Sequence, residues 1–506
     1  MNPVHASAVQ IVRAPWVVTG VRDRFTPEVL TDAAVVHQGS RVREIGDFSV
    51  MAARHPEAAV THFPRHMLLP GFVNSHHHVG ITPLALGSPD LPLELWFASR
   101  LAGRDVDPYL DTLYGAFDMI ASGITCVQHL HPRFAGGPEQ LHAGCSRVLA
   151  AYRAVGMRAS FAYSLREQNR FVYGDDAAFC ASLPADIGSA LADHLQRFTL
   201  GLDEQLALYE SLRVDTAGDD LLRIQLAPAN FHWMTDDGLL TVAERARADS
   251  VPMHMHLLET PLQKEYARRR TGTTAVRHLH RLGVLGPDMT LGHAVWLDEG
   301  EIELIAQSGT CVCHNCSSNA RLRSGTAPVN ALARHGVTIG LGLDEAGMND
   351  DRDMLQEMRL ALRAHRVPGF DEADVPTCTQ VLRMATEHGA ATTPFKGQIG
   401  RLAPGMFFDA VAINLHAATW PFQDDMVSPL DALIQRAKKE HVDAVYIGGD
   451  AVYAGGRFTH VDRVAVLAEL ADKLSRPRTA TEEHRKWLAS AVLPHVKAFY
   501  ADYFVN

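Results

Sequence analysis

The sequence lacks most features that mark secreted, membrane-bound or nucleic-acid-binding proteins. Its 506 residues carry a net charge of -11, and Lys and Arg form no dense stripe, which argues against nucleic acid as a partner. The longest apolar runs, such as MLLPGFV, are far too short to span a membrane, and the first residues lack the pattern of a secretion signal. Seven cysteines without disulfide-type spacing favour reduced thiols, and we expect a cytoplasmic protein.

Three of these cysteines, Cys311, Cys313 and Cys316, lie close together in GTCVCHNCSSN. A thiolate metal site is one interpretation of this group. However, Cys311 and Cys313 fall on a predicted buried strand, where cysteine packs as a small apolar residue. The preferred interpretation is therefore structural packing.

Apolar segments alternate with amphipathic helices through the middle of the chain. The expected strands cover residues 67–73, 125–130, 158–165, 223–228, 251–258, 289–294, 309–315 and 337–344. Eight strands, each followed by a helix, predict a (β/α)8 barrel over residues 67–399. A doubly wound open sheet is the alternative. It would need a glycine-rich phosphate loop after the first strand, where the chain reads NSHHHVG.

The two ends of the chain have a different pattern. Residues 1–66 and 400–460 contain short alternating strands with glycine-rich turns, and we expect both pieces to form one small composite β-sandwich. Residues 461–506 form a helical extension with several aromatic residues. We expect this extension to pack on the barrel or on a second subunit, and we expect a homodimer or homotetramer.

Histidines recur at alternate positions near the ends of two predicted strands. His76 and His78 share one strand face and can both point into the barrel mouth, because side chains on a strand alternate between faces. His254 and His256 repeat this spacing on the fifth strand, with His254 about 6.6 Å deeper. A metal ion at the mouth therefore favours His256, and His254 is expected to be a buried, hydrogen-bonded histidine.

Three further polar residues follow later strands. Glu259 lies just beyond the fifth strand, His293 ends the sixth and Asp344 ends the eighth. A carboxylate after an apolar run is costly to bury without a partner, and a cation is a suitable one. Because active groups of such barrels gather at the carboxyl ends of the strands, these side chains predict one divalent metal site. We expect zinc, with Fe2+ as the alternative. The fourth strand, RIQLAPAN, has no lysine that could bridge two metals.

The sequence resembles the amidohydrolase superfamily, especially the branch that contains S-adenosylhomocysteine and methylthioadenosine deaminases, guanine deaminase and the triazine chlorohydrolases. The resemblance covers about residues 8–460 and rests on motifs that include PGFVNSHHHV, HMHLLE, LGHAVWL, HNCSSNARLRSG, LGLDEAGMNDDRDMLQEMRLA and IGRLAPGMFFDAVAINL. It implies His76, His78, His256 and Asp344 as metal ligands, with Glu259, His293 and Asp344 as catalytic residues.

The resemblance implies a metal-dependent hydrolase that acts on carbon–nitrogen bonds other than peptide bonds. The predicted reaction is deamination of an amino-substituted heterocycle, such as a purine, pterin, pyrimidine or triazine, by a metal-bound hydroxide. Asp344 would accept the proton of the water and deliver it to the leaving group. Protonated Glu259 would exchange a proton with the ring nitrogen, and His293 would form a hydrogen bond to the attacking oxygen. Removal of chloride or an alkylamine, or ring opening of a cyclic amide, is the alternative. A catalytically silent scaffold is a remote alternative.

Six residues are candidates for the substrate pocket. They are Trp96, His129, Arg166, Gln168, Asn169 and His232. Arg166 could bind a carboxylate or ring carbonyl through two hydrogen bonds, or it could form a structural ion pair. Ala229 stands where the related enzymes commonly have a histidine, and His232 could replace that group. This departure argues against an adenosine-type substrate.

Overall fold

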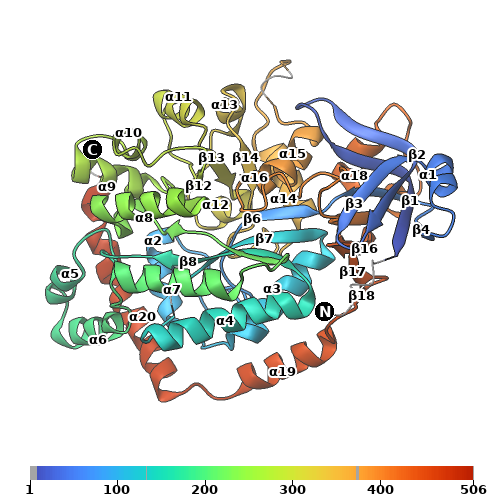
Figure 1. Ribbon diagram of the computed structural model, residues 1–506. Coiled ribbons are helices and arrows are strands. Elements are labelled where there is room, and N and C mark those ends of the chain that lie inside the picture. Colours follow the sequence, from blue (N-terminus) through green and yellow to red (C-terminus); the bar gives the residue numbers. More distant parts are fainter. Residues whose placement is uncertain (1–7, 133, 372–374, 505–506) are drawn as a thin grey trace.

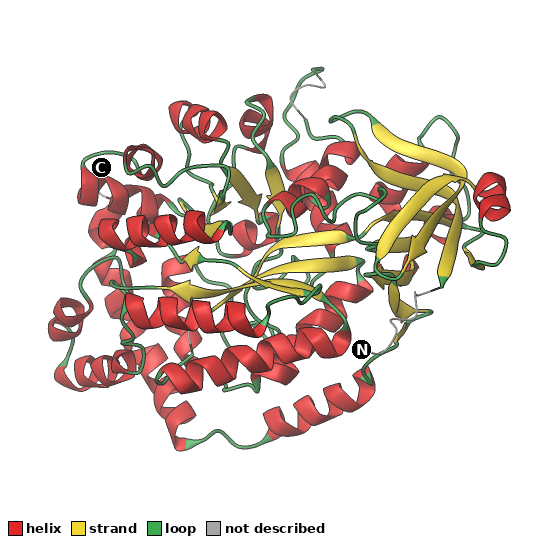
Figure 2. Cartoon of the chain, viewed as in Figure 1, coloured by secondary structure: helices red, strands yellow, loops and turns green. Residues whose placement is uncertain are grey.

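The structure is a computed structural model that describes residues 8–132, 134–371 and 375–504. Parallel strands form its centre, and helices surround them (Figures 1 and 2). The central strands are β6 (Phe72–His77), β7 (Ile124–His131), β8 (Arg158–Leu165), β9 (Leu222–Ile224), β10 (Ala227–Pro228), β11 (Met253–Leu257), β12 (Met289–His293), β13 (Cys311–His314) and β14 (Ile339–Leu341). The short β9 and β10 together occupy the fourth strand position.

These strands close into a ring. One ladder contains β6 to β10 and the other contains β11 to β14. Isolated parallel bridges join the two ladders on both sides. They lie between Leu226 and Met253 and between Asn230 and His256 on one side, and between His77 and Asp344 on the other. The central unit is therefore a (β/α)8 barrel, which confirms the predicted fold class.

Helices cover the outside of the barrel and fill several of its loops. The outer helices are α3 (Pro108–Ala121), α4 (Pro138–Val155), α7 (Leu202–Asp215), α8 (Asp236–Asp249), α9 (Pro261–Thr271), α10 (Ala275–Arg281), α11 (Glu299–Ser308), α13 (Val329–Arg334), α14 (Met354–Ala364), α15 (Cys378–Met384) and α16 (Glu387–Ala391). The loop helices that matter below are α2 (Leu93–Ser99), α5 (Asp176–Ser182), α6 (Ala185–Gln196) and α12 (Cys316–Arg321). A large apolar core between strands and helices holds the two layers together.

Strands from both chain ends share one nine-stranded sheet beside the barrel, where blue and red segments lie together in Figure 1. Its members are β1 (Val9–Val21), β2 (Pro27–Gln38), β3 (Arg41–Asp47), β4 (Ala59–His62), β5 (His66–Pro70), β15 (Ala410–Asn414), β16 (Val442–Ile447), β17 (Asp450–Ala454) and β18 (Arg457–Phe458). The seam between the two ends is the antiparallel pairing of β15 with β5.

The expected strand over residues 67–73 is two strands. β5 belongs to the nine-stranded sheet, whereas β6 begins the barrel. Gly71 lies between the two strands. The backbone passes so close to β7 here that a Cβ would lie 2.2 Å from the side chain of Thr125. The sequence shows one apolar run here because both strands are fully buried.

A buried ion pair joins the barrel to the sheet. The guanidinium of Arg158 on β8 makes two hydrogen bonds of 2.7 and 2.9 Å to Asp409, which precedes β15. Removal of one partner would leave the other charge buried and unpaired, which is strongly destabilising. The division of the chain into domains at residues 66, 399 and 460 stays a prediction.

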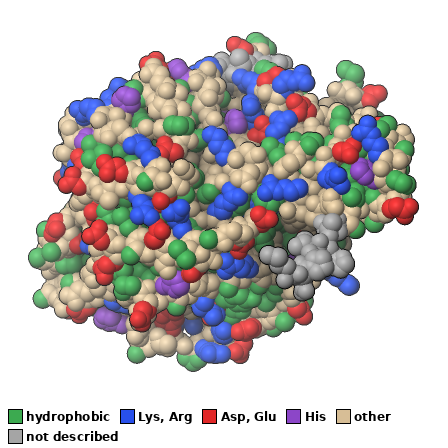
Figure 3. All heavy atoms as spheres, in the orientation of Figure 1, with side chains coloured by type: hydrophobic (Ala, Val, Ile, Leu, Met, Phe, Trp, Pro, Cys, Tyr) green, Lys and Arg blue, Asp and Glu red, His purple; other side chains and the backbone are tan. Residues whose placement is uncertain are grey.

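The C-terminal segment packs on this chain's own barrel. Helix α19 (Arg463–Ser475) contacts α3, and α20 (Ala480–Phe499) contacts α2 and α6. Leu488, Val492 and Val496 on α20 bury their side chains against Val172 and Tyr173. Among the described residues, no helix is both long and apolar enough to cross a membrane. Basic and acidic side chains are interspersed over the face in Figure 3.

Candidate metal centre and active site

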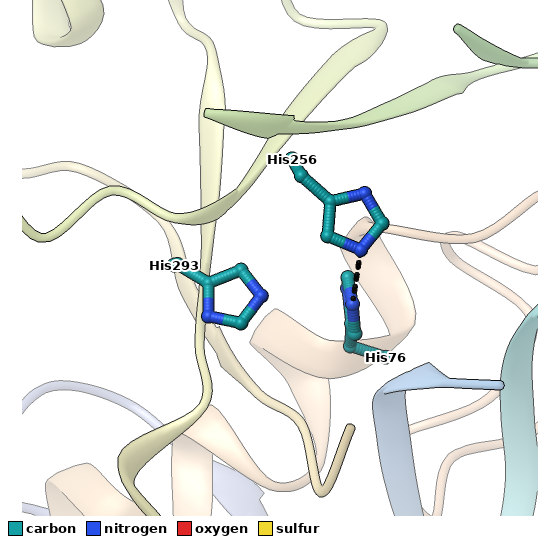
Figure 4. Close-up of side chains that lie close together, drawn as sticks. All are labelled: His76, His256 and His293. Atoms are coloured by element: carbon teal, nitrogen blue, oxygen red, sulfur yellow. Dashed lines mark hydrogen bonds between the residues drawn. The ribbon is translucent and has the colours of Figure 1, made fainter. Parts of the chain in front are cut away.

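The six predicted catalytic and metal-binding residues lie together at the carboxyl ends of the barrel strands. They are His76, His78, His256, Glu259, His293 and Asp344. All except the partly exposed His256 are buried. Figure 4 shows that the rings of His76, His256 and His293 point toward a common centre although they come from three different strands. Their roles in binding and catalysis stay a proposal.

Three imidazole nitrogens converge at this centre. The Nε2 atom of His76 lies 3.0 Å from Nε2 of His78 and 3.1 Å from Nε2 of His256. The last two atoms are 3.1 Å apart. Oδ1 of Asp344 lies 3.1 Å from Nε2 of His78 and 3.6 Å from Nε2 of His76. Nε2 of His76 therefore lies at the junction of two close groups of potential ligands, one with His78 and Asp344 and one with His256 and His293.

Backbone carbonyls set the proton positions on two of these rings. Nδ1 of His78 donates to the carbonyl of Leu130 at 2.6 Å, and Nδ1 of His256 donates to the carbonyl of Ala229 at 2.7 Å. In the neutral form, both rings carry their lone pair on Nε2, facing the centre. Burial would lower the pKa of the His78 imidazole, but without a metal ion the hydrogen bond and charge of Asp344 raise it, and a bound cation would take the place of the extra proton. The residues present therefore fit a divalent metal ion.

His254 lies beneath the centre. Its Nε2 atom is 2.9 Å from Nδ1 of His76, which places it as a hydrogen-bonding support of that ring. Burial lowers the pKa of His254 to about 3, so it is neutral at physiological pH.

The end of the eighth strand brings Asp344 unusually close to the first strand. The Asp344 amide donates to the carbonyl of His76 at 2.8 Å, and its φ of 52° lies in the left-handed region. Gly342 permits this approach, because a Cβ there would lie 2.5 Å from Cβ of His76. A strained residue at a convergent polar centre is typical of functional sites.

The buried carboxyl groups have opposite electrostatic environments. Burial alone would raise the pKa of Asp344, but hydrogen bonding and charge interactions with His78 lower it well below its usual range. Burial raises the pKa of Glu259 well above its usual range, and the charge of Asp344 adds to that effect. One carboxyl is therefore ionised while the other holds its proton, which is the division that acid–base catalysis needs.

Several supporting residues were not predicted individually. Ser318 donates to Oδ2 of Asp344 at 2.5 Å, and Ser324 donates to Oε1 of Glu259 at 3.2 Å. Nδ1 of His293 donates to Asn319 at 2.8 Å, while the amide of Asn315 donates to Nε2 of His293 at 3.2 Å. All four belong to HNCSSNARLRSG. That stretch was recognisable as a motif, but its small polar residues look like an ordinary loop in the sequence.

The predicted pocket residues separate into two groups. Arg166 and His232 line a cavity of about 460 Å³ beyond the barrel mouth, and the Arg166 guanidinium lies 3.5 Å from the centre of the Trp233 ring. Trp96 is buried and lines a small hollow beside Ser318 and Glu345.

The other three candidates do not line that cavity. Gln168 donates to the carbonyl of Met234 at 3.1 Å, and Asn169 donates to the carbonyl of His232 at 3.0 Å, so both hold the loop that carries His232. The prediction that His129 lines the substrate pocket is wrong. Its Nδ1 atom lies 2.7 Å from the Tyr152 hydroxyl of α4, in the layer between barrel and helices. The alternation of β7 turns His129 outward.

The chain matches the amidohydrolase family over residues 67–452. A 5-methylthioadenosine/S-adenosylhomocysteine deaminase from Pelotomaculum thermopropionicum is 30% identical over 408 residues, which cover 79% of this chain and 84% of that protein. The fold is similar to an adenosine deaminase from Xanthomonas campestris with bound zinc, at a TM-score of 0.76 and 24% identity, covering 92% and 98% of the two chains. It is also similar to a zinc complex of atrazine chlorohydrolase from Arthrobacter aurescens, at a TM-score of 0.78 and 21% identity, covering 91% and 99%. The chain therefore belongs to the amidohydrolase family.

Proposed function

We propose that this amidohydrolase is a metal-dependent hydrolytic deaminase of an amino-substituted nitrogen heterocycle. The observation that carries the proposal is the pairing of buried Glu259, whose pKa is raised, with ionised Asp344 beside three convergent imidazoles. A protonated carboxyl suits a C=N substrate, because the ring nitrogen must take up a proton as water adds to the carbon. Relatives named as deaminases support the same reaction class.

His76, His78, His256 and Asp344 would hold the ion. Their nitrogen and carboxylate ligands suit zinc, and we propose zinc, with Fe2+ as the alternative. When bound, the ion would supply positive charge and acidify a water molecule near neutral pH.

Each catalytic side chain has a separate task in the proposed reaction. Asp344 accepts a proton from the attacking water and passes it to the departing amine. Glu259 donates its proton to the ring nitrogen. His293 exchanges the hydrogen bond that its Nε2 atom accepts from the Asn315 amide for one from the water. Its Nδ1 proton is held by Asn319, and its Nε2 atom lies 3.8 Å from Oδ2 of Asp344 and 3.7 Å from Oε2 of Glu259. Ammonia leaves as the carbonyl forms, and the hydroxyl proton of the adduct passes to Glu259, which restores its protonated state.

The surroundings favour a planar substrate with acceptor groups. The 460 Å³ cavity combines aromatic rings with guanidinium groups, among them Phe97, Trp233, Arg100 and Arg166. Aromatic faces stack on heterocycles, and guanidinium groups bind ring carbonyls or carboxylates. We propose that Arg166, His232 and Trp96 contact the substrate and that Gln168 and Asn169 position His232.

The test is a substrate panel with zinc-loaded protein. It contains aminopurines, pterins, aminopyrimidines, chlorotriazines and cyclic amides, and it records ammonia, chloride and ring opening separately. Ammonia release from at least one aminoheterocycle, lost in Glu259→Gln, is the expected result. Chloride release or ring opening without ammonia would replace the deaminase with one of the alternative hydrolases. No turnover by folded, metal-loaded protein on any substrate would support the scaffold.

We also propose an oligomeric state and a cellular location for the protein. Trp420, Phe422 and Met426 expose 67%, 72% and 89% of their surface in one short segment, which is unusual for a surface facing only water. We propose that this segment contributes to a homodimer or homotetramer, which light scattering would detect. The seven free cysteines agree with the expected cytoplasmic location.

A further inference from the structure

A second cluster of metal-binding side chains lies behind the seventh strand. His314 ends β13, Cys316 begins α12 and His365 follows α14. One potential ligand atom from each residue lies within 4.8 Å of the other two. We propose that His314, Cys316 and His365 form a second metal site, which takes a zinc-like divalent cation that prefers imidazole and thiolate ligands.

The two imidazoles are already placed as a pair of ligands. Nε2 of His365 lies 2.9 Å from Nε2 of His314, close to the 3.0 Å and 3.1 Å separations at the first centre. Zinc–ligand bond lengths place tetrahedral ligands about 3.3–3.6 Å apart. The two imidazoles and the Cys316 thiol, all within 4.8 Å of one another, are close to that spacing.

The imidazole pair is buried. His314 and His365 expose only 1% and 5% of their surface, and the Nε2 atom of each ring has the other as its hydrogen-bond partner. An ion between the two Nε2 atoms would take the place of the proton that they share. The neighbours of Cys316 in the sequence indicate apolar packing. They do not include His365, which follows α14 and lies 51 residues beyond His314.

A cavity connects the cluster with the outside. It has a volume of about 280 Å³, and all three side chains line it together with Asn319 and Thr326. It offers an entry path and room for a water molecule as fourth ligand. Burial lowers the pKa of His365 to about 4, so this ring is neutral and has a lone pair for a metal.

The Cys316 thiol must lose its proton when the ion binds. Burial raises its pKa well above the usual range, and coordination would convert the thiol to a thiolate with release of one proton per ion. Glu357 also acts on this thiol when it is ionised, and it would then add a negative group near the proposed cation. The site is separate from the barrel mouth, although α12 also carries Ser318 and Asn319 toward Asp344 and His293.

Cobalt distinguishes the two sites because only the second contains a thiolate ligand. Metal-free protein is loaded with Co2+, its near-ultraviolet thiolate-to-cobalt absorption is recorded, and bound metal is counted by mass spectrometry after gel filtration. We expect two ions per chain and a thiolate band. Cys316→Ser should lose the band and one ion. Cys378→Ser is the control, because Cys378 and Cys316 are both 7% exposed.

Two further variants make each outcome decisive. His256→Gln should lose one ion but keep the thiolate band, which separates failure of the first site from failure of the second. His365→Asn should lose the band with Cys316 intact, and it replaces Cys316→Ser if that variant does not fold. Folded wild-type protein without a thiolate band, or a band that survives in Cys316→Ser, would overturn the proposal.

Discussion

Two His-x-His pairs on neighbouring barrel strands end in opposite environments. His76 and His78, at the end of β6, point into the barrel mouth and face Asp344. His129 and His131, on β7, bond to each other at 3.0 Å, and His129 also bonds to Tyr152 of an outer helix. The same spacing of the same residue type therefore gives part of a candidate metal centre on one strand and a polar contact within the helix layer on the next.

Strand direction and register explain the difference. Every residue of β6 and β7 is buried, because the barrel core covers one face and the helices cover the other. Burial alone cannot tell which face a histidine occupies. The neighbouring residues show which face it is, because Leu130 packs with Ala162 and Ala227 inside the barrel. The residues on either side of Leu130 must therefore point outward.

The largest expected effect comes from the inward-facing carboxylate. Asp344→Asn keeps the size of the side chain but removes the charge that faces His78 at 3.1 Å and the base that accepts the water proton. We expect turnover to fall about 10³-fold or more while the protein stays folded. Steady-state rates and circular dichroism measure the two effects. Retention of a large part of the activity would contradict the proton-transfer role.

One variant on each face tests the comparison, and the inward one is at His256, whose Nε2 atom lies 3.1 Å from Nε2 of both His76 and His78. His256→Gln, on the inward face, should lose one metal ion per chain and most of the activity. His129→Gln should keep the metal and the activity, and lose about 1 kcal/mol of stability with its bond to Tyr152. Metal analysis and urea unfolding of both variants give the contrast. Loss of metal in His129→Gln would mean that the outer pair also holds an ion.

The sequence predicted the barrel and the six convergent residues because their signals are local. Apolar runs mark strands, and polar residues such as Asp344 stand out at the ends of those runs. The sequence could not divide residues 66–77 into strands of two different sheets, since both are buried. It could not assign His129 to the outer layer or join His365 to Cys316, because these contacts depend on register and on helix placement.

Glu259→Gln has a smaller expected effect than Asp344→Asn and separates catalysis from recognition. The amide keeps the shape of the side chain and the contact with Ser324 but cannot donate a proton to the ring nitrogen. We expect kcat to fall about 10²-fold, with a much smaller change in KM. A large rise in KM with little change in kcat would make Glu259 a recognition residue.

The last effect is on stability alone and comes from a buried carboxyl of the outer layer. Glu357 on α14 accepts hydrogen bonds from the amide and hydroxyl of Ser317, yet burial raises its pKa to about 7. The unfolded carboxyl ionises near pH 4.5, so between these values the folded chain binds more protons than the unfolded chain. The free energy of unfolding should therefore fall as pH rises from 4.5 to 7, by about 2–3 kcal/mol from this group.

Glu357→Gln removes the titration, so its urea midpoint should change less between pH 5 and pH 7 than that of the wild type. Glu299→Gln is the control, because Glu299 is 64% exposed in its ion pair with His335 and should leave the pH dependence close to that of the wild type. An unchanged slope in Glu357→Gln would mean that Ser317 holds the carboxylate ionised. The outer layer would then stabilise a buried negative charge by hydrogen bonding alone, whereas the barrel mouth does so for Asp344 with imidazoles as well.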